Sequence, residues 1–88
     1  MKSVATRRFW RLFQELPEDA QRLAIKNYEM WRANPSHPSL HFRRLEGSTD
    51  LVTARIGNHY RALGHQESGN VTWVWIGTHA EYDRMSKG

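Results

Sequence analysis

The sequence has no cysteine among its 88 residues. Neither disulfides nor thiolate metal sites can therefore supplement the core of so short a chain. Thiol redox chemistry and cysteine-based zinc fingers are excluded for the same reason. Stability must come from packing, and the four Trp, three Tyr and three Phe provide large apolar surfaces for it.

Long hydrophobic runs are also missing. The longest apolar segments span only a few residues, and the opening MKSVATRRFW has no stretch typical of a signal peptide. We therefore expect a cytoplasmic protein without membrane contact. Because 39% of the residues are hydrophobic and 25% are charged, we expect one folded domain spanning residues 1–88.

Lysine is scarce, with three Lys against ten Arg and none between Lys26 and Lys87. The net charge is +4 and the isoelectric point is about 10.0. Arginine suits bidentate phosphate contacts because its planar guanidinium presents several donors. Between His37 and His65 four arginines accompany four of the five histidines, with only Glu46 and Asp50 opposing them. This distribution indicates a polyanionic partner.

The first half of the chain is predicted to be helical. Apolar residues at helical spacing end near Leu16, and a second helix begins at Pro17 and stops at Asn34-Pro35. The basic residues of the first helix form an exposed face, with contact to ribosomal RNA as the alternative. The apolar face of the first helix holds Phe9, Leu12, Phe13 and Leu16, the basic face holds Arg7, Arg8 and Arg11, and the second apolar face runs from Ala20 to Trp31.

The second half is predicted to form strands near residues 40–45, 51–56, 60–65 and 71–76, separated by turn residues. The last of these, VTWVWI, is apolar on both faces, as expected of a central strand. All four tryptophans are expected in the core. The predicted fold class is α+β, with two N-terminal helices packed on an antiparallel sheet of about four strands.

The hairpin around Gly57 allows a sharper prediction. A two-residue loop would place Arg61 on the same face as Ile56, whereas a three-residue loop, residues 57–59, keeps one face apolar. The longer loop places Arg55 directly opposite Arg61. Because like charges at paired positions destabilise a sheet, this pair indicates an anion site.

Four segments in a fixed order carry a resemblance to a known family. They are ELPEDAQRLA, NPSHPSLHFRRL, ARIGNHYRALG and WVWIGTHAEYDRM. Together they resemble the RelE/HigB-like toxins of type II toxin–antitoxin systems, over nearly the whole chain from Phe9 to Met85. The order of the segments is more specific than any one of them.

The resemblance implies a curved sheet and an endoribonuclease that cleaves messenger RNA on the ribosome and is neutralised by a cognate antitoxin. It implies no cofactor. Two alternatives stay open, because ParE toxins of the same fold inhibit DNA gyrase, and an inactive relative would only bind its antitoxin. His37, His41 and His59 have no metal-ligand spacing, and we expect no metal.

The resemblance also suggests roles for individual residues. Arg61 and Arg55 would stabilise the scissile phosphate, His79 would exchange protons, and Tyr82 would position the substrate. The position of His79, just after the last strand, resembles the pattern in the YafQ and HigB branches of the family, where histidines share the acid–base work. The chain departs from the family pattern because no lysine lies between Lys26 and Lys87. Proton transfer would therefore fall to histidine or tyrosine, because arginine is a poor general base.

Supporting roles fall to Arg43 and Arg44, which would hold flanking phosphates, and to His65 as a second proton-transfer group. Each candidate also has a purely structural alternative. The arginines before Arg61 fit a solvated strand face, and His79 fits a cap at a helix start. Tyr82 equally fits packing against Trp73 or Trp75.

Overall fold

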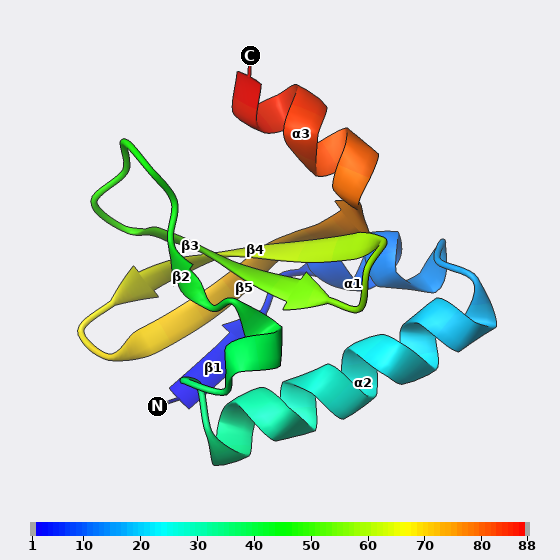
Figure 1. The fold of residues 1–88 in the computed structure, drawn as a ribbon, viewed down its shortest axis with the longest axis horizontal. Coiled ribbons are helices and arrows are strands. Elements are labelled where there is room, and N and C mark those ends of the chain that lie inside the picture. Colours follow the sequence, from blue (N-terminus) through cyan, green and yellow to red (C-terminus); the bar gives the residue numbers. More distant parts are fainter. Residues whose placement is uncertain (1, 88) are drawn as a thin grey trace.

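The computed structural model describes residues 2–87, with side chains up to Met85. Figure 1 shows two N-terminal helices below and behind a twisted sheet, and a third, C-terminal helix that projects above the sheet in this view. In chain order the elements are β1 (Lys2–Ala5), α1 (Arg7–Gln14), α2 (Glu18–Ala33), a short 3-10 turn η1 (Pro38–Leu40), β2 (Arg43–Arg44), β3 (Leu51–Ile56), β4 (Tyr60–Glu67), β5 (Asn70–Thr78) and α3 (His79–Lys87).

The sheet has five strands in the order β1-β5-β4-β3-β2. Strands β2 to β5 are antiparallel, and β1 is added parallel to β5. The predicted α+β class is therefore confirmed. The sheet was predicted to be antiparallel but is mixed, because the unpredicted strand β1 runs parallel to β5. Its four residues KSVA are too short to carry a strand pattern, and burial alternates along them with Val4 facing solvent.

The helical hairpin lies where the sequence places it. Thr6 caps α1 through a hydrogen bond from the Phe9 amide to its hydroxyl, at 3.1 Å. The α2 helix follows Pro17, carries acidic Glu18 and Asp19 in its first turn, and ends before Asn34. Acidic side chains at this end interact favourably with the helix dipole.

The core lies between the helices and one face of the sheet. Trp31 from α2 and Trp73 from β5 meet edge to face at 5.4 Å between ring centroids, and both are buried with Leu40, Val52 and Val71. Trp75 is buried as well, so the expectation of core tryptophans is confirmed for three of them. It is wrong for Trp10, which is 50% exposed.

The β3–β4 hairpin has the predicted three-residue turn. Ile56 pairs with Tyr60 and Arg55 pairs with Arg61, so the turn comprises residues 57–59. Gly57 has φ +62°, and a Cβ there would lie 2.6 Å from the Leu23 side chain. The positive φ favours glycine at this position, and a larger residue would also have to displace the Leu23 side chain.

The strand expected over residues 40–45 is reduced to Arg43–Arg44. Leu40 instead closes the turn η1, where it is buried, and His41 adopts a left-handed conformation with φ 45°. This turn lets Leu40 enter the core, so the extended backbone begins only at Arg43. No helix within residues 2–87 is long and apolar enough to cross a membrane.

Candidate anion-binding site

A polar pocket of about 160 Å³ lies on the face of the sheet opposite α1 and α2. Strands β3 and β4 form its floor, the turn before β2 forms one side, and α3 forms another. We call it the cationic pocket. Its lining residues are His41, Arg43, Thr53, Arg55, Arg61, His79, Tyr82 and Asp83.

Arg61 is the central cation of the pocket. Its NH1 nitrogen is buried and finds no acceptor within the described residues. Burial, and then the adjacent Arg55 cation, lower the pKa of the Arg61 guanidinium below its ordinary value. A buried donor without an acceptor is costly, so this guanidinium is well placed to accept an anion.

Arg55 is held in place by the hairpin turn. Its Nε donates to the Gly57 carbonyl at 3.0 Å, and its NH2 donates to the Asn58 side-chain oxygen at 2.9 Å. These bonds use two of the three guanidinium nitrogens and hold the group in a fixed position beside Arg61. The His41 ring lies 3.5 Å from its remaining NH1 nitrogen.

The start of α3 positions His79. Thr78 and Glu81 form a reciprocal cap in which the Thr78 amide donates to Glu81 Oε1 at 3.0 Å and the Glu81 amide donates to the Thr78 hydroxyl at 3.1 Å. The Thr78 amide and hydroxyl both lower the pKa of the Glu81 carboxyl. The His79 amide also donates to the His59 carbonyl, which ties α3 to the hairpin turn.

The His79 ring faces Asp83 one helical turn later, with 3.3 Å between Nε2 and Oδ1. When Nε2 carries the proton donated to this carboxylate, Nδ1 is left as the acceptor. Tyr82 packs against Trp75 at 6.5 Å between ring centroids and also lines the pocket. The packing against Trp75 that the sequence suggested as one alternative is therefore present, and the ring also borders the pocket.

Two predicted residues lie outside the cationic pocket. Arg44 pairs with Val52, on the other side of β2 from Arg43, which pairs with Thr53. His65 lies four residues along β4 from Arg61, about 13 Å away for an extended strand.

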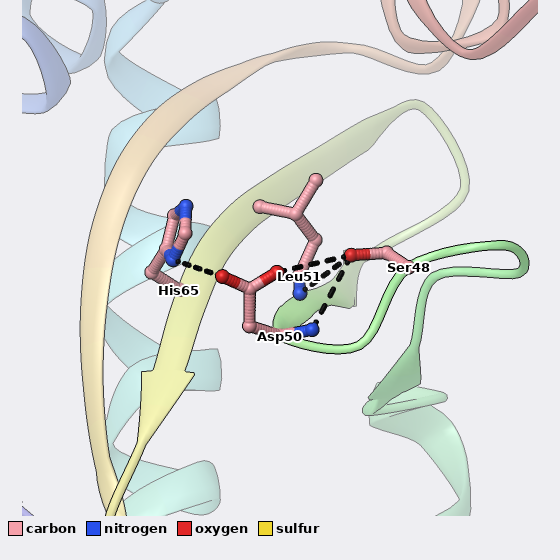
Figure 2. A network of polar contacts seen from close by, with 4 residues as sticks. All are labelled: Ser48, Asp50, Leu51 and His65. Carbon is pink, nitrogen blue, oxygen red and sulfur yellow. Dashed lines mark hydrogen bonds and ion pairs between the residues drawn. The ribbon is translucent and has the colours of Figure 1, made fainter.

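His65 instead anchors the β2–β3 loop, as Figure 2 shows. Its Nδ1 lies 3.0 Å from Asp50 Oδ2. The Ser48 hydroxyl donates to Asp50 Oδ1 and accepts the amides of Asp50 and Leu51. The network connects the loop to β4 and accounts for the His65 side chain without a role in the pocket.

Sequence reasoning did not select His41, Thr53 or Asp83. Asp83 stands four residues after His79, and a predicted helix over this segment would have placed the two side chains on one face. His41 reaches the pocket through its left-handed backbone, which no pattern indicated. Among the described residues, no three His, Asp or Glu side chains gather as a metal site.

Comparisons with known proteins agree with this architecture. Residues 18–84 match the model of the ParE-like toxin domain, whereas no curated protein matches the chain. The RelB–RelE antitoxin–toxin complex of Methanococcus jannaschii has a similar structure, with a TM-score of 0.72 and 14% identity over 92% of this chain and 96% of that one.

Two further toxin structures are similar as well. The YoeB/ParE toxin of Agrobacterium tumefaciens has a TM-score of 0.68 and 18% identity, over 90% of this chain and 99% of that one. The isolated RelE toxin of E. coli has a TM-score of 0.67 and 12% identity, over 98% and 96%. At these identities the likeness establishes the fold, and the family match establishes membership. The chain belongs to the ParE-like toxin domain family.

Proposed function

We propose that this protein is the toxin of a toxin–antitoxin pair and that it acts as an endoribonuclease on messenger RNA bound to the ribosome. The observation that carries the proposal is the cationic pocket, where the buried, unsatisfied NH1 of Arg61 lies beside Arg55, with His79 and Tyr82 on the adjacent wall. A protein that only binds another protein has no need of this combination.

The pocket has the groups that cleavage by the 2′-hydroxyl requires. The 2′-oxygen attacks phosphorus, the bond to the 5′-oxygen breaks, and a 2′,3′-cyclic phosphate and a 5′-hydroxyl end result. Arg61 and Arg55 stabilise the charge that develops on the phosphoryl oxygens. Arg43 holds the neighbouring phosphate, and Tyr82 stacks on an unpaired base.

His79 moves the proton in this proposal. With Nε2–H donated to Asp83, Nδ1 accepts the proton of the 2′-hydroxyl, and the carboxylate stabilises the imidazolium that forms. The imidazolium then returns the proton through water to the departing 5′-oxygen. Arginine cannot replace it, because its guanidinium stays protonated.

The partners in the proposal are messenger RNA, the ribosome and a cognate antitoxin. The RelB–RelE structures are antitoxin–toxin complexes of proteins with the same fold, and the net charge of +4 suits both RNA and an acidic inhibitor. The exposed Arg7, Arg8 and Arg11 on α1 provide further positive charge for ribosomal RNA.

Primer extension on cellular transcripts after induced expression tests the proposal. We expect new 5′ ends within coding regions, and their absence when Arg61→Met is expressed at the same level. The alternative suggested by the ParE-like family is gyrase inhibition. Unbroken transcripts together with a block of DNA supercoiling by the purified protein would replace the proposal with that activity. Loss of both activities would leave an inactive relative.

A further inference from the structure

The cationic pocket carries more positive charge than a single phosphodiester can balance. Its cations are Arg43, Arg55 and Arg61. Asp83 is the acidic residue of the lining, so a formal surplus of two positive charges remains while the lining histidines are neutral. A phosphodiester within RNA carries one negative charge, whereas a phosphate monoester carries about 1.5 to 2 at pH 7. The charge of the pocket therefore matches a monoester better than a diester.

The two central arginines offer donors to the same ligand. Arg55 and Arg61 occupy directly paired positions, where Cα atoms of antiparallel strands lie about 4.5–5.5 Å apart. NH1 of Arg61 is buried and has no acceptor within the described residues. NH1 of Arg55 lies 3.5 Å from the His41 ring, which is at the limit of a hydrogen bond. A tetrahedral oxyanion between the two guanidinium groups would supply an acceptor to each.

The size of the pocket limits what it can hold. Its volume of about 160 Å³ equals roughly five water molecules at about 30 Å³ each. One phosphoryl group fits this space, but a sugar with its base does not, since pockets for larger ligands usually exceed about 300 Å³. The pocket therefore recognises the phosphoryl group itself, and any sugar or base attached to it lies outside.

We propose that the cationic pocket binds free phosphoryl groups with two negative charges, either inorganic phosphate or a terminal phosphate monoester, and that these ligands compete with RNA. The competition rests on the proposed function, whereas the binding does not. Cleavage of RNA by this protein would then slow as free phosphate rises.

The preference for two charges is also what the proposed cleavage requires. When a 2′-oxygen attacks a phosphodiester, the phosphoryl oxygens gain a second negative charge in the transition state. A site that holds two charges better than one lowers the barrier, because only interactions stronger in the transition state accelerate the reaction. A free dianion presents the same charge without reacting, and it occupies the site as an inhibitor. The cyclic phosphate product carries a single charge and is released.

The binding test uses the full-length protein and two matched probes, methyl phosphate and dimethyl phosphate. The probes differ by one methyl group and one charge at about pH 7.5, where the monoester is a dianion. At constant ionic strength we expect saturable binding of methyl phosphate, followed by the side-chain NMR signals of Arg55 and Arg61. Its affinity should exceed that of dimethyl phosphate at least ten-fold. Equal affinities, or no saturable binding of methyl phosphate, would overturn the proposal.

Inorganic phosphate and uridine 3′-monophosphate distinguish the two sources of the ligand. Because the sugar and base lie outside the pocket, we expect the two affinities to agree within about three-fold, so that inorganic phosphate is a sufficient ligand. An affinity at least ten-fold higher for the nucleotide would contradict recognition of the phosphoryl group alone.

Three variants locate the binding of methyl phosphate. Arg61→Met should weaken it at least ten-fold, whereas Arg44→Met, outside the pocket, should leave it unchanged. Asp83→Asn should tighten it at least three-fold, because the carboxylate repels an anion in the same pocket. Equal loss in both arginine variants would contradict the assigned site, and weaker binding in Asp83→Asn would contradict the charge argument.

Single-turnover cleavage of RNA tests the competition. Methyl phosphate should slow cleavage in proportion to its occupancy of the pocket, and dimethyl phosphate at the same concentration should not. Full cleavage at saturating methyl phosphate would overturn the competition. Absence of cleavage without any probe would instead overturn the proposed function, and the probe affinities would then decide the binding inference by themselves.

Discussion

Arg55 and Arg61 occupy directly paired positions across β3 and β4. The two differ in how their hydrogen-bond donors are used. Arg55 donates to the turn that follows it, whereas NH1 of Arg61 is buried and has no acceptor within the described residues. Like charges at paired positions cost stability, and an anion bound between them would offset that cost.

Replacing Arg61 with Met should lower RNA cleavage and raise stability. RNA cleavage should fall at least about 100-fold, because the phosphoryl charge loses a preorganised donor. The free energy of unfolding should rise by about 1 kcal/mol, since an unsatisfied buried donor disappears, which is roughly 4–8 °C in melting temperature. Arg44→Met, outside the pocket, is the control and should change neither quantity. A less stable Arg61→Met protein would mean that Arg61 has an internal partner.

His79→Gln tests proton transfer. The variant keeps a polar side chain at the start of α3 but cannot exchange protons, so cleavage should fall by about 10²- to 10⁴-fold with unchanged RNA affinity. Asp83→Asn should give a smaller loss, because it removes the charge that stabilises the imidazolium. Single-turnover cleavage and filter binding measure the two quantities. Full activity in His79→Gln would assign proton transfer to another group.

Much of the fold could be predicted because the hydrophobic pattern and the local geometry agree. The β3–β4 register followed from keeping Arg61 away from the face of Ile56, and the helix corner followed from Pro17. The β1 strand escaped prediction because its pairing with β5 is a tertiary contact of a four-residue segment. The α3 helix was not predicted because its polar sequence HAEYDRMSK has little apolar periodicity.

The grouping of the pocket residues could be predicted where they share a strand face and could not where a turn brings them together. Arg43, Arg55 and Arg61 follow from strand alternation and register. His41 depends on a left-handed residue after the turn η1. His65 has the same facing as Arg61, but position along the strand takes it to Asp50 instead. Alternation predicts which face a residue occupies but not which end of the sheet.

Gly77→Ala should disturb the wall of the cationic pocket from behind. A Cβ at this position would lie 2.5 Å from the Trp75 ring and 3.1 Å from Glu81 Oε1. The ring must then move, and with it Tyr82, which packs against it. We expect a loss of about 1–3 kcal/mol in stability together with reduced cleavage. Gly47→Ala is the control for general destabilisation, because its Cβ meets nothing within 4 Å but its φ of +85° strains the backbone. Cleavage should survive in that variant, and equal loss in both would show that stability alone governs activity.

The cap of α3 should make stability depend on pH in the acidic range. The Thr78 amide and hydroxyl hold the pKa of Glu81 below its ordinary value. A carboxyl whose pKa is lowered by folding adds stability above its unfolded pKa of about 4.3, and this contribution disappears as pH falls through the folded pKa. Glu81→Gln should therefore lower the free energy of unfolding by roughly 0.5–1 kcal/mol at pH 7. The difference should vanish at a pH where the Glu81 carboxyl of the unsubstituted protein is fully protonated. Urea unfolding of the protein and the variant across this range gives the difference directly, with Glu46→Gln as the exposed control. A difference that stays constant as pH falls would mean that the Glu81 charge contributes nothing to the cap.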